Sequence, residues 1–456
     1  MIKKIIMFII SCFFMFGFGH MPIDIGLTPE ANTMIGIFIG AITLWLTVDV
    51  GWPSLLVLFS LTQLPGATTA NIVSSSLGNN TIAFLIFSCV LTYALSASGI
   101  LRRIALWFVN RKNQKSTPWQ LAIMYFLSIL VIGSFIAPTV LFVLYMSLSK
   151  EIFKSNRIQP GDEYGRMLMC GTAIMTSISC AMTPIAHTFP LMALGYYESA
   201  TGNAINWIDY MKIGIPAGLI IAAVTICCLY LGFKDKIANF DMEIMEGMGP
   251  IKKEEIISLV VFLGVVFMWL ISGVAPDLFP ILKTWTTTIP PIFGIVILCL
   301  LGVLDFNEAL KKGVPWTSII LCGTTLAVGK YLTSEELGIT AALGSAIGNV
   351  LTNPSADLMI FLIAAFTIIM TNFMSNIVTT TVSYNLMMPI VLATGVISPE
   401  LTAILVGMCA SMAYATPPAI AHVALAAGSE YCNTKTMLIY GGIASIMSIM
   451  FVTLMA

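Results

Sequence analysis

The sequence predicts an all-α polytopic membrane protein, and three observations carry this prediction. Of its 456 residues, 58% are hydrophobic and only 9% are charged, against roughly 25% charged in an ordinary soluble domain. The apolar residues gather in runs of about 20, the length that a helix needs to cross a bilayer. Basic residues are concentrated in some of the connecting segments, which predicts an orientation in the membrane. This composition excludes a soluble enzyme and a disordered protein, and a net charge of −1 gives no surface for nucleic acid.

Eleven apolar runs are predicted to be single crossings of the membrane. They cover residues 5–19, 32–49, 52–65, 81–98, 166–195, 211–232, 256–273, 289–304, 316–331, 402–428 and 437–455. The N-terminal part, 1–31, holds the first helix and a loop. Its apolar run resembles a secretory signal peptide, but no small-x-small cleavage site follows, so a retained helix is the better interpretation.

Two further apolar segments, 118–150 and 357–394, are too long for one crossing and are interrupted near their middle. The first is broken at 137–139 (Ala-Pro-Thr) and the second at 375–379 (Ser-Asn-Ile-Val-Thr). A segment broken in this way can enter the membrane and return to the same side if its tip is buried in protein or lines a watery cavity. We therefore expect about eleven transmembrane helices plus two re-entrant hairpins.

The basic residues set the predicted topology. Lys3 and Lys4 place the N-terminus in the cytoplasm, and the segment 99–118 has five basic residues and no acid, as cytoplasmic loops do. The first hairpin leaves from this segment, so it opens to the cytoplasm. The range 331–434 contains the whole second hairpin and no Lys or Arg. The second hairpin should therefore open to the outside, and an odd number of crossings leaves the C-terminus there too.

Hairpins that enter from opposite faces indicate an inverted repeat. The first repeat would be 32–235 and the second 256–456, joined by a charged cytoplasmic linker at 236–255. Five crossings and one hairpin in each repeat would invert the second repeat relative to the first. Inverted repeats with discontinuous helices are typical of secondary transporters, whose sites lie near the bilayer midplane at the repeat interface.

A local match supports the pairing of the two repeats. The first hairpin is followed by Thr-Pro-Ile-Ala-His at 183–187, and the second by Thr-Pro-Pro-Ala-Ile-Ala-His at 416–422. These motifs are 233 to 235 residues apart, close to the 238 residues between Ala137 and Ser375. Each repeat is therefore predicted to contain a hairpin and, after it, a crossing helix broken at Thr-Pro.

Broken helices can bind ions without charged side chains. A half-helix N-terminus attracts anions, while freed carbonyls with Ser, Thr and Asn oxygens suit a hard cation such as Na⁺. Ser375 and Asn376 at the hairpin tip, with the break at 416–418, would then hold a carboxylate and a sodium ion. The alternative is that these polar residues only mediate helix packing.

Other polar residues in the apolar runs have two interpretations each. Asp49 is either a proton site or a cap between two spans, and the cap is favoured. His187 and His422 either titrate during transport or are satisfied polar residues beside each break, which is favoured. The ten cysteines lie in apolar runs without metal-ligand spacing and are interpreted as buried hydrophobic residues.

Four motifs make the chain similar to a known family. They are Trp45-x-Thr47-x-Asp49-x-x-x-Pro53, the run from Gly78-Asn79-Asn80-Thr81 to Gly99-Ile100-Leu101-Arg102-Arg103-Ile104-Ala105, Thr371-Asn372-Phe373-Met374-Ser375-Asn376-Ile377 followed by Thr379 and Pro389, and Ala415-Thr416-Pro417-Pro418. In this order they resemble the divalent anion/sodium symporter family, the carriers of dicarboxylates, citrate and sulfate. The resemblance covers about 32–456.

The resemblance implies eleven spans with two re-entrant hairpins, a homodimer, and a transport domain that moves as an elevator against a fixed scaffold. By position, the residues implied to bind substrate are Thr139, Ser375, Asn376, Thr379, Thr416 and Pro417. The second sodium site is implied to consist of Thr371, the Met374 carbonyl, Asn376 and the Ala415 carbonyl.

The first hairpin departs from the family pattern. Ala137 and Pro138 replace the expected Ser and Asn, and Gly133 replaces an upstream Ser ligand. Pro138 also removes a backbone N–H donor. Only Thr139 survives, and the break at Thr183 can still offer carbonyls. The first sodium site is therefore expected to be degraded, which implies an altered stoichiometry or a different substrate.

The predicted function is a secondary active carrier of small anions, a di- or tricarboxylate such as succinate, coupled to Na⁺ and without an organic cofactor. Its location would be a bacterial-type inner membrane. The alternatives are a Na⁺/H⁺ antiporter, an arsenite-type or sulfate permease, or an uncoupled exchanger. A membrane enzyme is disfavoured, because no catalytic motif of the usual kinds occurs. A channel is a further, less favoured class, and it would predict a conductive leak where alternating access predicts saturable uptake.

Overall fold

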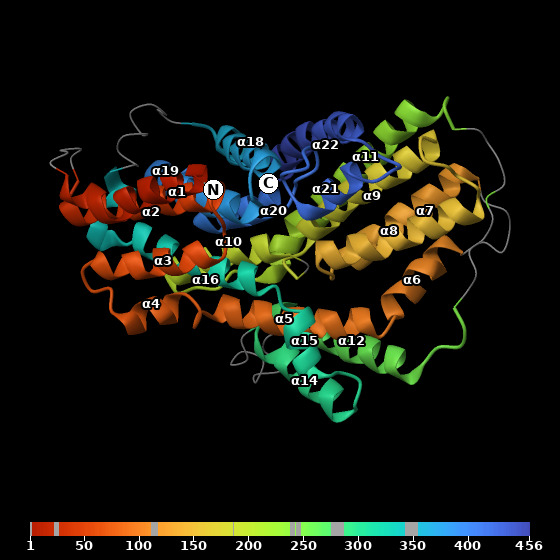
Figure 1. The fold of residues 1–456 in the computed structure, drawn as a ribbon, viewed down its shortest axis with the longest axis horizontal. Coiled ribbons are helices and arrows are strands. Elements are labelled where there is room, and N and C mark those ends of the chain that lie inside the picture. The colour runs from red at the N-terminus through yellow and green to blue at the C-terminus, as the bar shows by residue number, and fades with distance from the viewer. Residues whose placement is uncertain are drawn as a thin grey trace.

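The computed structural model describes residues 2–21, 27–110, 117–185, 187–237, 242, 248–274, 287–342 and 354–456. Within them the chain forms helices joined by turns (Figure 1). The first half consists of α1 (Ile2–Gly17), η1 (Phe18–His20), α2 (Pro29–Thr47), α3 (Trp52–Ser60), η2 (Leu61–Gln63), α4 (Thr69–Ser75), α5 (Asn80–Ala97), α6 (Ile100–Val109), α7 (Pro118–Gly133), α8 (Pro138–Ser155), α9 (Glu163–Met182), α10 (Thr188–Thr201) and α11 (Trp207–Phe233). The second half consists of α12 (Lys253–Val274), α14 (Ile289–Leu300), α15 (Phe306–Lys312), α16 (Trp316–Leu332), η3 (Glu335–Leu337), α18 (Ala356–Phe373), α19 (Asn376–Thr394), α20 (Pro399–Ala410), α21 (Ala421–Ala427) and α22 (Thr434–Met455).

Several helices begin where the sequence supplies a polar cap. Thr28, Ser355 and Ser398 accept a hydrogen bond from the backbone N–H three residues later, at the starts of α2, α18 and α20. Thr117 and Gln120 form a reciprocal capping box at the start of α7. These local hydrogen bonds set the residue at which each of these helices begins.

Eight of the described helices are long and apolar enough to cross a membrane, and three shorter ones are also apolar. The fold is therefore all-α and polytopic, as predicted. The number of crossings, and the return of the hairpins to the side they entered, stay predictions. The short helices α4, α6 and α15 were not predicted, because they lie between the apolar runs.

The helix breaks differ from the predicted positions by a few residues. Pro138 and Thr139 begin α8, so the first break covers Ser134–Ala137, because proline is favoured in the first helical turn. Residues 377–379 lie within α19, so the second break is only Met374–Ser375. The predicted crossing 166–195 is divided into α9 and α10, and 402–428 into α20 and α21.

The first pair of helices, α7 and α8, packs side by side and antiparallel. The Tyr125 hydroxyl lies 2.6 Å from the Ser149 hydroxyl, and Tyr145 donates to Ser128 at 2.7 Å. From the first bond to the second, the residue number rises on α7 and falls on α8. The two helices therefore run antiparallel, as in a hairpin. In the second hairpin, α18 and α19 are also in contact with each other, and both pack against α20.

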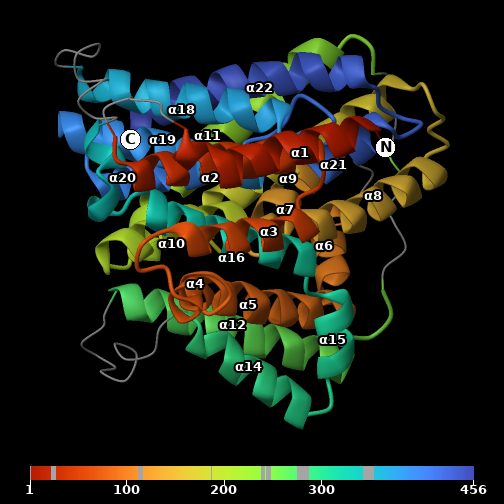
Figure 2. The same cartoon turned by 60° about the vertical axis from the view of Figure 1, so that its left-hand side comes forward.

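The two hairpins and the broken helices form one group of the bundle. Helices α7, α9, α11, α18, α20 and α22 contact one another in sequence-distant pairs such as α9 with α11 and α11 with α22. Figure 2 shows α18 and α22 on one side of the molecule, with α5, α12 and α14 on the opposite side. Helix α16 contacts α10, which follows the first broken helix α9, and α19 of the second hairpin. It also contacts α2, α3, α4 and α5.

The few charged side chains tie helix ends together. Arg103 at α6 forms an ion pair with the buried Glu255 at the start of α12, with 2.9 Å between Nη2 and Oε2. Arg102 pairs with Glu151 of α8 at 2.7 Å. Asp49 Oδ1 accepts from the Gly51 N–H at 2.8 Å in the turn between α2 and α3, so the favoured interpretation of Asp49 as a cap is confirmed.

Candidate functional site

Four helices begin at the breaks, and none of them has a side-chain cap. The residues before α8, α10, α19 and α21 are Ala137, His187, Ser375 and Ile420, and no side chain of these four bonds to the following turn. The first N–H groups of a helix have no partner within it and carry partial positive charge. The breaks therefore bring four electropositive helix starts into the interior of the bundle.

Asn372 organises the second break. Its Oδ1 accepts from the backbone N–H groups of Tyr414 and Ala415, at 2.9 and 2.8 Å. Its Nδ2 donates to the Ile368 carbonyl at 2.8 Å. The Thr416 hydroxyl donates to the Asn372 carbonyl. Because Asn372 lies in the last turn of α18, and Tyr414, Ala415 and Thr416 belong to the unwound segment after α20, one residue holds the hairpin tip against the broken helix.

A polar stripe without protein partners follows the second break along α19. Asn376, Thr379 and Ser383 are 2%, 0% and 0% exposed. Neither amide atom of Asn376, nor the hydroxyl of Thr379 or Ser383, has a hydrogen-bond partner among the described residues. Their spacing of three and four places them on one face of the helix. Since buried polar atoms are nearly always paired, this stripe is suited to a polar ligand.

The other residues implied for the second sodium site lie near the end of α18, at the second break and in the segment after α20. The buried Thr371 hydroxyl donates to the Ala410 carbonyl at 2.7 Å, which leaves its oxygen lone pairs to accept or coordinate. Met374 is extended after α18, and the Ala415 N–H is fixed by Asn372. Ser375 and Pro417 are half-buried. In the structure, Thr371 lies near the end of α18, and Ala415 and Thr416 are hydrogen-bonded to Asn372 of the same helix. Asn376 and Thr379 lie on the adjacent helix, α19.

The first break has a similar backbone frame but different side chains. The Thr183 hydroxyl donates to the Ser134 carbonyl, as Thr416 does to Asn372. The Ser134 hydroxyl, however, returns to its own helix at Leu130. A Cβ on Gly133 would lie 2.1 Å from the Ser179 hydroxyl oxygen, so close packing against α9 leaves no room there for a larger residue.

The remaining residues of the first break are mostly apolar or exposed. Ala137 lines a cavity, Pro138 is buried and Thr139 is exposed. Among the described residues, no buried polar atom without a partner belongs to 133–139 or to 183–188. The polar atoms available to a ligand are therefore concentrated at the second break.

Two histidine–serine pairs cross between the two halves of the chain. His187 Nδ1 lies 3.0 Å from the Ser411 hydroxyl, and His422 Nε2 lies 2.6 Å from the Ser177 hydroxyl. Ser177 also donates to the Ala413 carbonyl at 2.7 Å. A serine hydroxyl has a single hydrogen, so Ser177 accepts from His422 Nε2–H. Each histidine therefore connects its own break to the other half. The favoured interpretation of satisfied polar residues holds only in part, because His422 Nδ1 is buried and has no hydrogen-bond partner among the described residues.

Some residues of this frame were not singled out from the sequence. Asn372, Ser134, Ser177 and Ser411 carry the contacts between the breaks. Asn372 and Ser134 are 238 residues apart, the separation already noted between Ala137 and Ser375. A systematic search at this offset would have found the pair.

Comparison with known proteins identifies the family. The chain matches the sodium:sulfate symporter transmembrane region over residues 2–456. It is 25% identical to the sodium-dependent dicarboxylate transporter SdcS of Staphylococcus saprophyticus, covering 93% of this chain and 86% of that one. It is 24% identical to the putative malate transporter YflS of Bacillus subtilis, covering 72% and 68%. These relatives are transporters, and the chain is not an enzyme.

Solved structures support the fold alone. The YdaH transporter of Alcanivorax borkumensis superposes with a TM-score of 0.61 at 13% identity, covering 84% of this chain and 86% of the other. MtrF of Neisseria gonorrhoeae also gives 0.61, at 14% identity, covering 87% and 84%. With a family match over nearly its whole length, the chain belongs to the family of the sodium:sulfate symporter transmembrane region and is an integral membrane protein.

Proposed function

We propose that the protein is a sodium-coupled symporter of small dicarboxylates, with succinate as the representative substrate. The single observation that carries this proposal is the polar stripe of Asn376, Thr379 and Ser383, which is buried and has no hydrogen-bond partner in the part of the chain that the structure describes. It begins at an uncapped helix start. A site of this kind offers N–H groups to a carboxylate and oxygens to a cation at the same place.

The absence of charged side chains at the breaks explains the need for a cation. No Asp, Glu, Lys or Arg occurs in 133–139, 183–188, 371–379 or 411–422. A charge near the middle of a bilayer is costly, and a bound Na⁺ would neutralise part of the charge of the anion. The names of the relatives, which include sodium-dependent dicarboxylate and malate transporters, favour a dicarboxylate over the sulfate of the family name.

Sodium would be bound mainly at the second break. Thr371, the Met374 carbonyl, Asn376 and the Ala415 carbonyl supply the oxygen ligands in this proposal. The first site, at Gly133, Ala137, Pro138 and Thr183, lacks side-chain amides and has no unpartnered buried polar atom among the described residues. We infer that one sodium site is intact and the other is degraded.

The proposed mechanism is an elevator with an inverted repeat. The repeats would be 32–235 and 256–456, with re-entrant hairpins α7–α8 and α18–α19 and a cytoplasmic linker at 236–255. The crossed His–Ser pairs support this arrangement, because equivalent residues of two repeats make reciprocal contacts. The hairpin group would move against the other helices in a homodimer, with the N-terminus in the cytoplasm and the C-terminus outside the inner membrane.

The competing functions differ in what they require at the breaks. A Na⁺/H⁺ antiporter needs a titratable buried acid, and the break segments contain none. A sulfate or arsenite-type permease would prefer a compact inorganic anion over a dicarboxylate. An uncoupled exchanger would transport without a sodium gradient. The substrate profile and the sodium dependence therefore separate these alternatives.

Uptake into proteoliposomes tests the proposal. The purified protein is expected to take up succinate and malate with saturation, at least about tenfold faster with an inward Na⁺ gradient than with K⁺. Sulfate, arsenite and a monocarboxylate are the comparison substrates, and empty liposomes are the control. Uptake that is equal in Na⁺ and K⁺, or that does not saturate, would overturn sodium-coupled carriage.

A further inference from the structure

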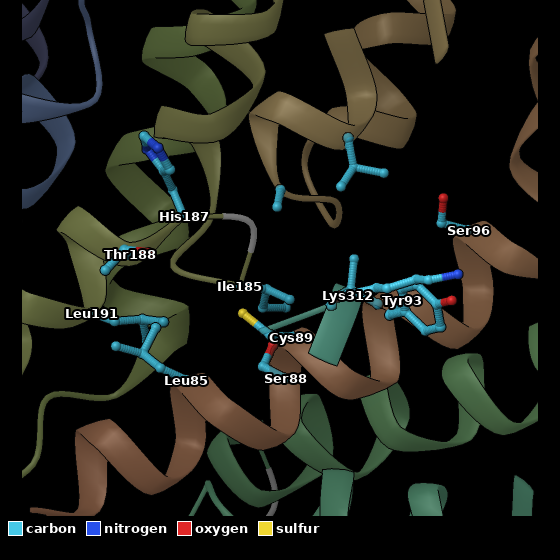
Figure 3. Close-up of a pocket in the computed structure, with 14 residues that line it drawn as sticks. Leu85, Ser88, Cys89, Tyr93, Ser96, Ile185, His187, Thr188, Leu191 and Lys312 are labelled. Carbon is cyan, nitrogen blue, oxygen red and sulfur yellow. The ribbon is translucent and has the colours of Figure 1, made fainter. Parts of the chain in front are cut away.

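A small cavity of about 110 Å³ lies beside the first break, outside the polar stripe of the second break. It is bordered by α5, the start of α8, the start of α10 and the end of α15, as Figure 3 shows. Its polar lining residues are Ser88, Thr92, Tyr93, Ser96, His187, Thr188 and Lys312. Most of the hydroxyl groups thus come from α5 and not from the hairpin, whose own contribution is Ala137 and Val140.

Lys312 is the one charged residue among those that line this cavity. Figure 3 shows it beside Tyr93, at the edge where Ser96 also lies, while His187 lies at the opposite edge. The Lys312 side chain is 66% exposed. The mouth of the cavity therefore has one lysine, paired with Glu308, and hydroxyl groups line the cavity between that mouth and the break.

The position of Lys312 is fixed by the packing of α15 on α5. A Cβ on the next residue, Gly313, would lie 2.7 Å from Cβ of Tyr93 and 2.8 Å from the Ala309 carbonyl oxygen. At the other end of α15, Asp305 Oδ1 accepts from the Glu308 N–H at 2.9 Å. Because both ends of this short helix are held, the lysine stem starts from a defined point.

The ammonium group of Lys312 has an exchangeable partner. Its Nζ donates to Glu308 Oε1 at 2.7 Å, and the Glu308 side chain is 47% exposed. This bond raises the pKa of Lys312, so the lysine is fully charged near neutral pH. A solvent-exposed pair one helical turn apart contributes little, so an arriving carboxylate can replace Glu308 with little loss.

The cavity is connected to the second break through one side chain. His187 lines it and lies 3.0 Å from the Ser411 hydroxyl, which begins the unwound segment that Asn372 binds. An anion in the cavity is thus one side chain away from the unwound segment after α20, which Asn372 binds. The uncapped start of α8 at Ala137 adds further positive potential on the same side.

We propose that this cavity is an access site for the carboxylates of a dianionic substrate, with Lys312 as its specificity-determining residue and the α5 hydroxyls as its neutral donors. The inference rests on the proposed function, because it assigns a route to the same substrate. In this site the substrate carboxylate takes the place of Glu308 on Lys312 as it passes between the breaks and the cytoplasm, the side to which the predicted topology assigns α15.

Substitutions at three neighbouring positions test the site. Lys312→Gln is expected to weaken succinate binding roughly threefold to tenfold, measured as the succinate concentration that gives half-maximal thermal stabilisation of the detergent-solubilised protein in Na⁺. Glu308→Gln is expected to strengthen binding, because the lysine then has no competing carboxylate. Lys311→Gln, one residue away and outside the cavity lining, is the matched control and should not change it.

The dependence on salt separates binding from a structural role. The difference between Lys312→Gln and the unmodified protein should shrink at high ionic strength, because salt screens exposed charges, and Lys312→Arg should retain most of the binding. Equal succinate binding in Lys312→Gln and the unmodified protein would overturn this site but not the proposed function. An unmodified protein that no succinate, malate or sulfate stabilises would overturn both.

Discussion

The first break, at Ser134–Ala137, and the second, at Met374–Ser375, are held by the same backbone contact but differ in side-chain chemistry. In each, a threonine from a Thr-Pro motif donates to a backbone carbonyl near the end of the hairpin's first helix, that of Ser134 or Asn372. Only the second break adds an amide that binds two further N–H groups and a polar stripe without partners. The backbone contact that holds a break is therefore independent of the side chains that could bind a ligand there.

This difference suggests that the two breaks have different roles. The second break has the groups to bind ions, whereas the first is closed by tight packing at Gly133 and by hydroxyl bonds within its own helix. At the first break the polar groups come from across the cavity, on α5 and α15. The two breaks thus share a backbone frame, and among the described residues the buried polar atoms without partners lie at the second break and not at the first.

The largest expected effect comes from removing the amide of Asn376. Asn376→Ala should lower sodium-dependent succinate uptake by roughly a hundredfold, because it removes a buried group that would bind both ions, at a cost of about 3 kcal/mol. Proteoliposome uptake at matched protein density measures this loss.

Asn385 supplies the matched control on the same helix. It is buried too, and its Nδ2 donates to the Thr381 carbonyl at 2.8 Å within α19, whereas its Oδ1 has no partner among the described residues. It follows Asn376 by nine residues, which places it on the opposite face of the helix from the stripe. Asn385→Ala should change uptake by less than about fivefold. Equal KM and maximal rate in Asn376→Ala and the unmodified protein would contradict the assignment of Asn376 as a ligand.

A smaller effect, on the free energy of unfolding, should distinguish the hydrogen bonds of the second break from those of the first. Asn372→Ala leaves the N–H groups of Tyr414 and Ala415 buried without a partner, which should cost about 2–4 kcal/mol. Ser134→Ala removes a bond to the preceding turn and a weak contact with the Met182 sulfur, and should cost less than about 1 kcal/mol.

Thermal unfolding of the two variants in the same detergent measures this contrast. The Tm of Asn372→Ala should fall by several degrees more than that of Ser134→Ala. Equal shifts would mean that Asn372 does not organise the second break, and that the frame depends on the threonine bonds alone.

Much of the fold follows from the sequence because a bilayer imposes simple rules. Apolar runs of bilayer length predict helices, and the structure has a helix at each of the eleven predicted crossings. The breaks were expected near the observed positions, but proline at 138 and the helical propensity of 376–379 moved them by a few residues. The short helices α4, α6 and α15 could not be predicted, because their helicity depends on packing against neighbours.

The site was predicted only in part, for a physical reason. Ser375, Asn376, Thr379 and Thr416 were identified because polar residues in apolar runs are conspicuous. Asn372 and the serines of the crossed pairs carry hydrogen bonds between segments 40 to 245 residues apart, which local patterns do not reveal. Lys312 gave no signal, since it lies in an ordinary charged loop and becomes interesting only when α15 packs beside α5.

The finest test of the comparison restores the first site. The double substitution Ala137→Ser with Pro138→Asn returns a hydroxyl, an amide and a backbone N–H to the start of α8. The sodium dependence of succinate uptake should then steepen, with a Hill slope that rises from about one toward about two, because the slope is limited by the number of coupled sites.

Gly133 makes this restoration a demanding test. Its packing against Ser179 excludes a side-chain ligand at that position, so the restored site would rely on residues 137–139 and on carbonyls near Thr183. A Hill slope near two in the unmodified protein would mean that two sodium ions already bind without these side chains. A slope that stays near one in the double variant, with uptake intact, would mean that the tight packing of the first break and not its missing amide prevents sodium binding.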